Sequence, residues 1–127
     1  MNKSKKWMIF GLVFAGFVFM MYYLYNNLNS GQYDEFAQCL TENGVKMYGA
    51  YWCPHCNEQK KMFGNSWDYV EYIECSLPNA AGQNDVCNVA GISGYPTWEL
   101  GNGTRLQGTQ TFETLSQLTN CPISSQS

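Results

Sequence analysis

The sequence predicts a compact α/β domain with a mixed central sheet, preceded by one transmembrane helix. Three observations lead to this class. A run of apolar residues without any charge occupies 7–25. Segments with strand-like and helix-like patterns then alternate through 33–121. Within that part, two cysteines stand where a strand-like stretch passes into a helix-like one. A chain of 127 residues suits one such domain with an appendage.

The apolar run 7–25 has the features of a membrane anchor. At ~1.5 Å per helical residue, its length is close to the ~30 Å of a bilayer core. All basic residues before Lys46 lie in 1–6, so the positive-inside rule places 1–6 in the cytoplasm and the rest outside. A cleaved signal peptide is the alternative, but its apolar region spans only about 7–15 residues. We therefore expect a single-pass protein of the plasma (inner) membrane, its helix in lipid and its domain extracytoplasmic (periplasmic).

The residues after the anchor divide into a polar linker (26–32), the domain (33–121) and a tail (122–127). Apolar residues spaced three or four apart indicate helices, and segments rich in β-branched and aromatic residues indicate strands. The expected elements are, in order, a helix at 34–40, a strand at 45–52, a helix at 54–63, a strand at 69–75, a short helix at 85–90, strands at 97–100 and 104–107, and a helix at 111–118.

The connections between these elements predict a mixed sheet. The first two strands are joined through a helix, which makes them parallel. The last two strands flank Gly101-Asn102-Gly103, a sequence suited to a hairpin turn, so they are antiparallel. The same turn explains Asn102-Gly103-Thr104 better than a glycosylation site does.

The charge of the external part excludes two classes of partner. Residues 31–127 contain ten acidic residues and only four basic ones, a net charge of −6. Such a domain lacks the positive surface that nucleic acids and anionic lipids require. Nucleic acid is therefore not expected as a partner.

The sequence Cys53-Pro54-His55-Cys56 carries the clearest chemical signal. Two cysteines separated by two residues can close a small disulfide ring or open to a dithiol. A helix that starts here would stabilise a thiolate on Cys53 through its unpaired N–H groups and positive dipole end. Cys53 is then the attacking sulfur and Cys56 the resolving one. The alternatives are a permanent disulfide and half of a zinc site, whose second half is missing. No metal or cofactor is expected.

These features together resemble the thioredoxin fold over about residues 33–121. The shared features are the order of elements, the Trp-Cys-x-x-Cys sequence at the first strand–helix junction, and Tyr95-Pro96-Thr97 before the third strand. Within that fold, three stretches resemble the thioredoxin-like domain attached to bacterial vitamin K epoxide reductase homologues: 47–56, 72–76 and 91–98.

The resemblance implies a thiol-disulfide oxidoreductase that exchanges disulfides with a membrane reductase and passes them to secreted or membrane proteins that contain thiols. It also implies that Tyr95, Pro96 and Thr97 form a cis-proline loop facing the redox site, where an extended substrate adds as a strand. Trp52, beside the first cysteine, is expected to contact substrates as well. An ordinary trans proline is the alternative for Pro96. Because the chain has one hydrophobic span instead of a four- or five-helix quinone-binding unit, a separate quinone-linked membrane partner is expected.

Two residues indicate the direction of electron flow. His55, the only histidine, can donate to the Cys53 thiolate or place positive charge near it, which stabilises the reduced form and makes the disulfide more oxidising. The Pro-His dipeptide also resembles that of DsbA-type bacterial oxidants. Thioredoxin-type reductases usually have a buried acid six residues before the first cysteine, where this chain has Met47. We therefore expect oxidation of substrates. The alternatives are a reductase or isomerase with the same site, and a merely exposed polar role for His55.

The other four cysteines are expected in disulfides, because six cysteines in an extracytoplasmic domain favour pairing. Six cysteines allow 15 full pairings, and spacing does not choose among them. The resemblance includes Cys75 and Cys87 as a pair, either a structural disulfide or a second redox relay that feeds Cys53. Cys39 and Cys121, near the first and last helices of the domain, either form a disulfide or remain two buried thiols. A non-enzymatic anchored binding module, with every cysteine pair structural, is the alternative of a different class.

Overall fold

The structure of the protein is a computed structural model that describes residues 2–124. It divides into two compact units, one ending at Ser30 and one beginning at Gly31. Residue 1 of the expected cytoplasmic segment 1–6, and residues 125–127 of the expected tail 122–127, lie outside the described residues.

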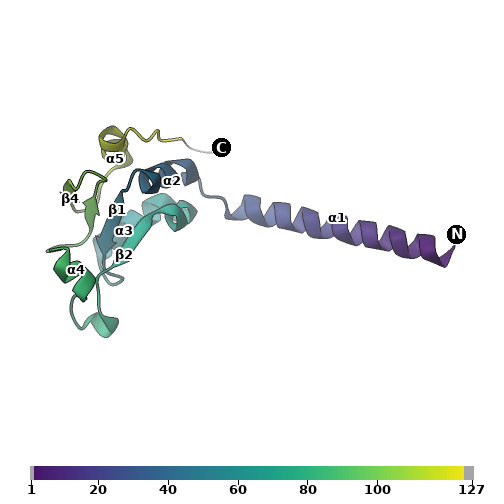
Figure 1. Cartoon of the computed structure of the whole chain (residues 1–127), viewed down its shortest axis with the longest axis horizontal. Helices are drawn as coiled ribbons and strands as arrows, with labels where there is room; N and C mark the ends of the chain where they lie inside the picture. Colours follow the sequence, from purple (N-terminus) through teal and green to yellow (C-terminus); the bar gives the residue numbers. More distant parts are fainter. Residues whose placement is uncertain (1, 125–127) are drawn as a thin grey trace. The chain divides into compact units, whose positions relative to one another are not determined.

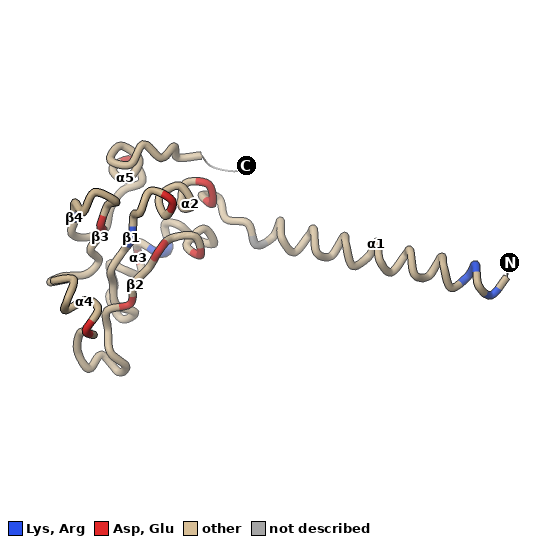
Figure 2. Tube along the Cα trace, in the orientation of Figure 1, with Lys and Arg blue, Asp and Glu red and all other residues tan. Residues whose placement is uncertain are grey.

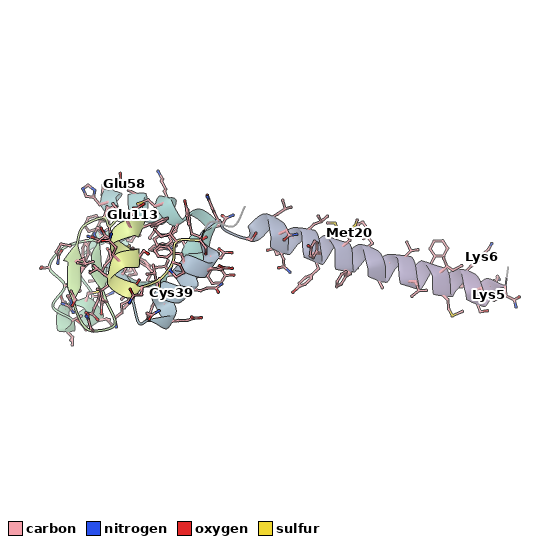
Figure 3. The ribbon with its side chains drawn as sticks, turned by 90° about the horizontal axis from the view of Figure 1, so that it is seen from above. Lys5, Lys6, Met20, Cys39, Glu58 and Glu113 are labelled. Atoms are coloured by element: carbon pink, nitrogen blue, oxygen red, sulfur yellow. A yellow bond between two sulfur atoms is a disulfide. The ribbon has the colours of Figure 1, made fainter. Side chains whose placement is uncertain are left out.

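The N-terminal unit is one helix, α1 (Lys3–Asn29), of 27 residues. Its side chains project on all sides along its whole length, from Lys5 and Lys6 near its start past Met20 (Figure 3). The structure buries none of this apolar surface. Basic residues are confined to the start of the helix (Figure 2). A helix that is apolar on all sides is suited to hydrocarbon rather than to water. By length and composition, α1 is able to cross a membrane.

The helix α1 extends beyond the predicted anchor at both ends. Residues 26–29, which the sequence places in the polar linker, continue the helix. Asparagine has a low helix propensity, but each residue added to an existing helix gains one backbone hydrogen bond, so polar residues can prolong it. The Ser30 N–H closes the last turn by donating to the Asn26 carbonyl at 3.1 Å. The linker is therefore shorter than expected.

The second unit contains a four-stranded sheet in the order β2-β1-β3-β4 (Figure 1). The strands are β1 (Lys46–Gly49), β2 (Glu71–Glu74), β3 (Thr97–Glu99) and β4 (Arg105–Gln107). The helices are α2 (Asp34–Glu42), α3 (Pro54–Phe63), α4 (Asp85–Val89) and α5 (Phe112–Thr119), with short 3-10 helices at Gly64–Tyr69 and Pro78–Ala80. β1 is parallel to β2 and antiparallel to β3, and β3 is antiparallel to β4. The predicted mixed sheet is confirmed.

Alternation along β1 gives the sheet two different faces. Met47 and its partner on β3, Trp98, are fully buried in the main core, which also contains residues of α2, α3 and α5. Tyr48, the next residue, belongs to a smaller cluster with Cys75 and Cys87. The α3 helix therefore packs on the face that carries Met47.

Aromatic rings and one buried amide hold α3 in the main core. The ring centroids of Phe63 from α3 and Phe112 from α5 are 4.7 Å apart. The side-chain carbonyl of Gln59, which is fully buried, accepts the Trp98 indole N–H at 3.0 Å and the Gln110 backbone N–H at 2.7 Å. A buried amide satisfied in this way fixes the position of its helix, because breaking either bond would leave an unpaired buried group.

All four strands are shorter than predicted, the first two by three residues or more. The strand expected at 45–52 ends at Gly49, because the chain then turns and the Cys53 N–H donates to the Ala50 carbonyl at 3.0 Å. The strand expected at 69–75 is reduced to β2, since a 3-10 helix at Gly64–Tyr69 follows α3 directly. Gly64 ends α3 at a φ of 57°, a conformation that glycine adopts without steric cost.

Candidate active site

The two cysteines of the Cys-Pro-His-Cys sequence lie where β1 leads through a turn into α3. Cys53 is the N-cap of this helix, and its Sγ accepts the Cys56 backbone N–H at 3.3 Å. Pro54 is the first helical residue, a position where its missing N–H costs no hydrogen bond. A sulfur held at the positive end of a helix, with an N–H directed at it, is stabilised as a thiolate.

Both sulfurs are almost completely covered. Cys53 is 4 % exposed and Cys56 0 %, and both are free thiols. The Cys53 thiol lies 3.8 Å from the Tyr95 carbonyl oxygen, to which it donates. The Tyr95–Pro96 peptide bond is cis, as predicted, and this loop faces the cysteines. Cys53 is thus the less deeply buried of the two cysteines, and it lies between the start of α3 and this loop.

Cys56 differs from Cys53 in its electrostatic surroundings. Burial, followed by the hydrogen bond with Cys53, raises the pKa of Cys56 to about 12. The hydrogen bond with the Ala50 backbone and the positive charge of Lys60 oppose this effect only in part. Cys56 is therefore a neutral thiol at physiological pH whenever the pair is reduced.

Two aromatic side chains, one half exposed and one partly buried, form a rim beside Cys53. Trp52 is half exposed, and its indole N–H donates to the Ser76 hydroxyl at 2.9 Å. Its ring meets that of Tyr95 edge to face, with centroids 5.9 Å apart. The Tyr95 hydroxyl in turn donates to the Gln83 side-chain carbonyl. The hydrogen bonds fix both rings, which leaves a preformed apolar surface next to the sulfur.

The remaining residues of the predicted substrate loop are covered. Pro96 and Thr97 are both fully buried. The Thr97 hydroxyl is used within the loop, where it donates to the Gly94 carbonyl at 2.7 Å. From this loop, only Tyr95 offers side-chain surface to a substrate.

In the part of the chain that the structure describes, His55 makes no hydrogen bond to the Cys53 sulfur, which was one of the two ways in which it was expected to act. Its side chain is 72 % exposed, and Nδ1 lies 3.5 Å from Oε2 of Glu58, one turn along α3. Within residues 2–124, no hydrogen bond joins the imidazole to Cys53. Any effect of His55 on the thiolate therefore acts through charge rather than through a direct bond.

The other four cysteines form two disulfides. Cys39 of α2 is bonded to Cys121, just beyond α5, and Cys75 is bonded to Cys87 of α4. The alternative of two free thiols at Cys39 and Cys121 is therefore wrong for this structure. Cys75 and Cys87 are fully buried in the smaller cluster, apart from the core cluster that contains Cys53 and Cys56.

The structure adds a group of residues on β2 that the sequence did not single out. The Tyr72 hydroxyl donates to Oε2 of Glu74 at 2.7 Å. A Cβ on Gly49 would stand 2.9 Å from the Tyr72 ring and 3.0 Å from the Cys56 sulfur, so only glycine here allows the ring to approach this sulfur. Strand alternation places Tyr72 and Glu74 on the same face, and that pattern was the available signal.

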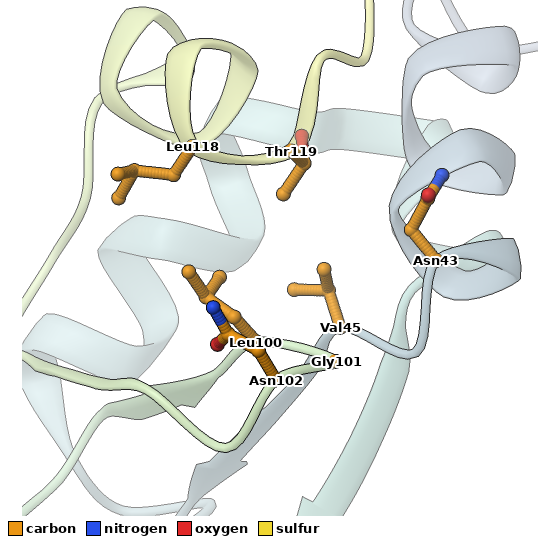
Figure 4. Close-up of a pocket in the computed structure, with 7 residues that line it drawn as sticks. All are labelled: Asn43, Val45, Leu100, Gly101, Asn102, Leu118 and Thr119. Atoms are coloured by element: carbon orange, nitrogen blue, oxygen red, sulfur yellow. The ribbon is translucent and has the colours of Figure 1, made fainter.

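A metal site and a pocket are the other kinds of site that the domain could contain. Within residues 2–124, no group of three or more His, Cys, Asp or Glu side chains could hold a metal ion. A surface hollow of about 210 Å³ lies between the α2–β1 turn, the β3–β4 hairpin and α5, lined by Asn43, Val45 and Leu100 among others (Figure 4). It lies at the start of β1, whereas the cysteines follow the end of that strand.

Comparison with known proteins finds a similar protein whose name states an activity. No family model matches the chain. The chain is 39 % identical over 88 residues to thiol-disulfide oxidoreductase LTO1 of Arabidopsis thaliana, an alignment that covers 65 % of this chain and 23 % of the relative. The chain thus spans less than a quarter of that relative's length. The mixed sheet of the second unit is compatible with a thioredoxin-like fold.

Proposed function

We propose that this protein is a thiol-disulfide oxidoreductase whose redox pair is Cys53 and Cys56. The observation that carries the proposal is the position of the Cys53 sulfur, which caps α3 and lies beside the Tyr95 carbonyl and the half-exposed Trp52. The other cysteines among the described residues are already paired. Similarity over 88 residues to a protein named as a thiol-disulfide oxidoreductase supports the same chemistry.

The proposed reaction transfers a disulfide in two exchange steps. A substrate thiolate attacks the Cys53 sulfur of the closed pair, the Cys53–Cys56 bond breaks, and Cys56 leaves with the electron pair and takes up a proton. A second substrate thiolate then attacks the substrate sulfur of the mixed disulfide. Cys53 leaves as a thiolate, which the Cys56 N–H stabilises. The substrate dithiol loses two electrons, and the enzyme disulfide gains them.

The enzymatic proposal is tested by trapping its intermediate. Replacing Cys56 by Ser removes the resolving sulfur, so substrates should accumulate as mixed disulfides on Cys53. The matched control is Cys56→Ser combined with Cys53→Ser, which should trap nothing. If Cys56→Ser captures no more protein than this control in cells, the non-enzymatic binding module is the correct interpretation.

We further propose that α1 anchors the domain outside the cytoplasm, with residues 1–6 inside. The length and apolar surface of the helix and the two disulfides support this, since disulfides persist in oxidising compartments. Alkaline phosphatase fused after the C-terminus folds only outside the cytoplasm. An active fusion is expected, and an inactive fusion that is nevertheless expressed would contradict the topology.

In the proposed direction, the pair oxidises thiol-containing secreted or membrane proteins. A quinone-linked membrane oxidoreductase, of the vitamin K epoxide reductase type or similar, then reoxidises it. The helix N-terminus at Cys53 and the apolar Met47 in the core support a stabilised reduced form. A reduction potential of about −270 mV or lower would instead favour the reductase or isomerase.

A further inference from the structure

The exchange steps do not explain how Cys56, the resolving cysteine, gains and loses its proton. Cys56 is 0 % exposed, yet it gains a proton each time the disulfide opens and loses one each time it closes. Because burial raises the pKa of Cys56 to about 12, the thiolate is a strong base when it leaves and the thiol is a weak acid when it must attack. Water does not reach the sulfur directly, so a protein group has to carry the proton.

On the core side of Cys56, one residue is able to carry the proton. Met47, across the sheet register from Tyr72, has no ionisable group. Tyr72 does: its hydroxyl and the Cys56 sulfur both lie within 3.3 Å of the point where a Cβ on Gly49 would stand. The absence of a side chain at Gly49 thus leaves the phenol oxygen and the buried sulfur bordering the same small space.

The phenol is joined to a carboxylate that lies nearer the surface. The Tyr72 hydroxyl donates to Oε2 of Glu74 at 2.7 Å. Oε1 of Glu74 accepts the Ser76 N–H at 2.9 Å and the Tyr51 N–H at 3.2 Å. These bonds fix the carboxylate, which is only partly buried and therefore exchanges protons with solvent.

We propose that Tyr72 and Glu74 form the proton relay of Cys56: the phenol passes a proton between the Cys56 sulfur and the Glu74 carboxylate. The proposal rests on the proposed function, since it assigns the acid–base groups of that same site. When Cys56 attacks a mixed disulfide on Cys53, its S–H proton goes to the Tyr72 oxygen and the phenolic proton goes to Glu74. The new Cys53–Cys56 bond forms as the bond to the substrate sulfur breaks, and the substrate leaves as a thiolate.

Other ionisable groups lie near Cys56, but none of them takes the place of Tyr72 and Glu74 in carrying the proton. Cys53 hydrogen-bonds to Cys56, and the backbone carbonyl of Tyr95 faces Cys53. Lys60, on α3, holds its ammonium 4.0 Å from the centre of the Tyr72 ring, where a cation is attracted by the ring face. Lys60 therefore positions the ring and stabilises negative charge on the sulfur, but it contacts the ring face and not the hydroxyl.

The test separates the two chemical steps in one experiment. The reduced full-length chain in detergent is mixed with 5,5′-dithiobis(2-nitrobenzoate). The Cys53 thiolate attacks this disulfide and releases one thionitrobenzoate, and Cys56 then closes the ring and releases the second. The variants are Tyr72→Phe and Glu74→Gln, which keep the shape of each side chain. Tyr48→Phe is the matched control, a buried tyrosine on β1 that belongs to the other core cluster.

The relay predicts that both variants slow the second release by about tenfold or more at neutral pH, with the first release within about twofold of the parent. The deficit should narrow near pH 9, because the much higher hydroxide concentration then lets rare local openings of the site suffice to remove the proton, and Tyr48→Phe should behave like the parent. A smaller deficit, one that does not change with pH, or an equal slowing of both releases would overturn the relay. Absence of the first release in the parent would instead overturn the proposed function.

Discussion

The domain contains two kinds of cysteine pair that are similarly buried but differently surrounded. Cys75, Cys87 and Cys121 are as fully covered as Cys56, and all three are closed in disulfides. Only the Cys53–Cys56 pair has a helix N-cap at one sulfur and a phenol–carboxylate pair beside the other. The difference teaches that burial alone does not separate a structural pair from a redox pair. The two kinds of pair are separated by the presence of groups that can stabilise a thiolate or accept a proton.

The largest predicted difference between the two kinds of pair is in catalysis. Cys53→Ser removes the attacking sulfur, so the oxidation of a reduced, unfolded test protein should fall to background, on the order of 10³-fold or more. Replacing Cys75 and Cys87 together by Ser should leave this rate within a few-fold of the parent. A second redox relay through Cys75 and Cys87 would be indicated if the double replacement lost activity while remaining folded.

The second difference is in stability. Here we expect replacement of the two structural disulfides, which should have little effect on catalysis, to have a large effect. The Cys39–Cys121 disulfide closes a loop of 82 residues and Cys75–Cys87 one of 12. Loop-closure entropy predicts losses of about 4.5 and about 3 kcal/mol when each pair is replaced by Ala. Urea unfolding of the oxidised chain measures both. Losses below about 1 kcal/mol for both pairs would show that these disulfides are not structural supports.

The third difference appears in the pH dependence of the reduced protein. The pKa of Cys56 is raised in the folded state, so its contribution to stability is fully present below the ordinary value of 9.0 and is lost as pH rises toward about 12. The slope from this group is about 1.4 kcal/mol per pH unit within that window. Unfolding of reduced parent and reduced Cys56→Ser, compared at several alkaline pH values, isolates it. Parallel curves for the two proteins would contradict the buried environment of Cys56.

The smallest predicted effect concerns His55. Its exposed imidazole lies beside Glu58 and makes no hydrogen bond to Cys53, so it contributes through charge that solvent screens. His55→Ala should therefore lower the reduction potential of the pair by only about 30 mV or less. Equilibration with glutathione buffers measures the reduction potential of His55→Ala. Glu58→Gln, which changes the partner of His55, is measured beside it. A drop of roughly 100 mV would mean that the imidazole contacts the thiolate directly in solution.

Much of the fold could be predicted from local sequence. The motif at Cys53 lies at the predicted strand–helix junction, because Pro54 and the preceding apolar stretch specify that boundary. The hairpin at β3 and β4 follows from its glycine-containing turn. What local sequence left open was set by contacts distant in the chain. The pairing of Cys39 with Cys121, 82 residues apart, depends on how α2 and the end of α5 pack.

The candidate site shows the same limit. The alternation of Tyr72 and Glu74 was visible, but their approach to Cys56 depends on the parallel register of β1 and β2 and on the bare backbone of Gly49. Of the two roles expected for His55, a hydrogen bond to the Cys53 thiolate and a positive charge near it, the described residues show no such hydrogen bond. The His55 side chain instead follows the outer face of α3, where Glu58 lies one turn away.

The most direct test of the contrast between the pairs is a redox titration of the full chain with differential labelling of each cysteine. Our account predicts that only Cys53 and Cys56 change from disulfide to dithiol between about −120 and about −270 mV. The Cys39–Cys121 and Cys75–Cys87 disulfides should stay closed to below about −300 mV. The account is contradicted if Cys53 and Cys56 stay bonded at that potential, or if either of the other disulfides opens together with them.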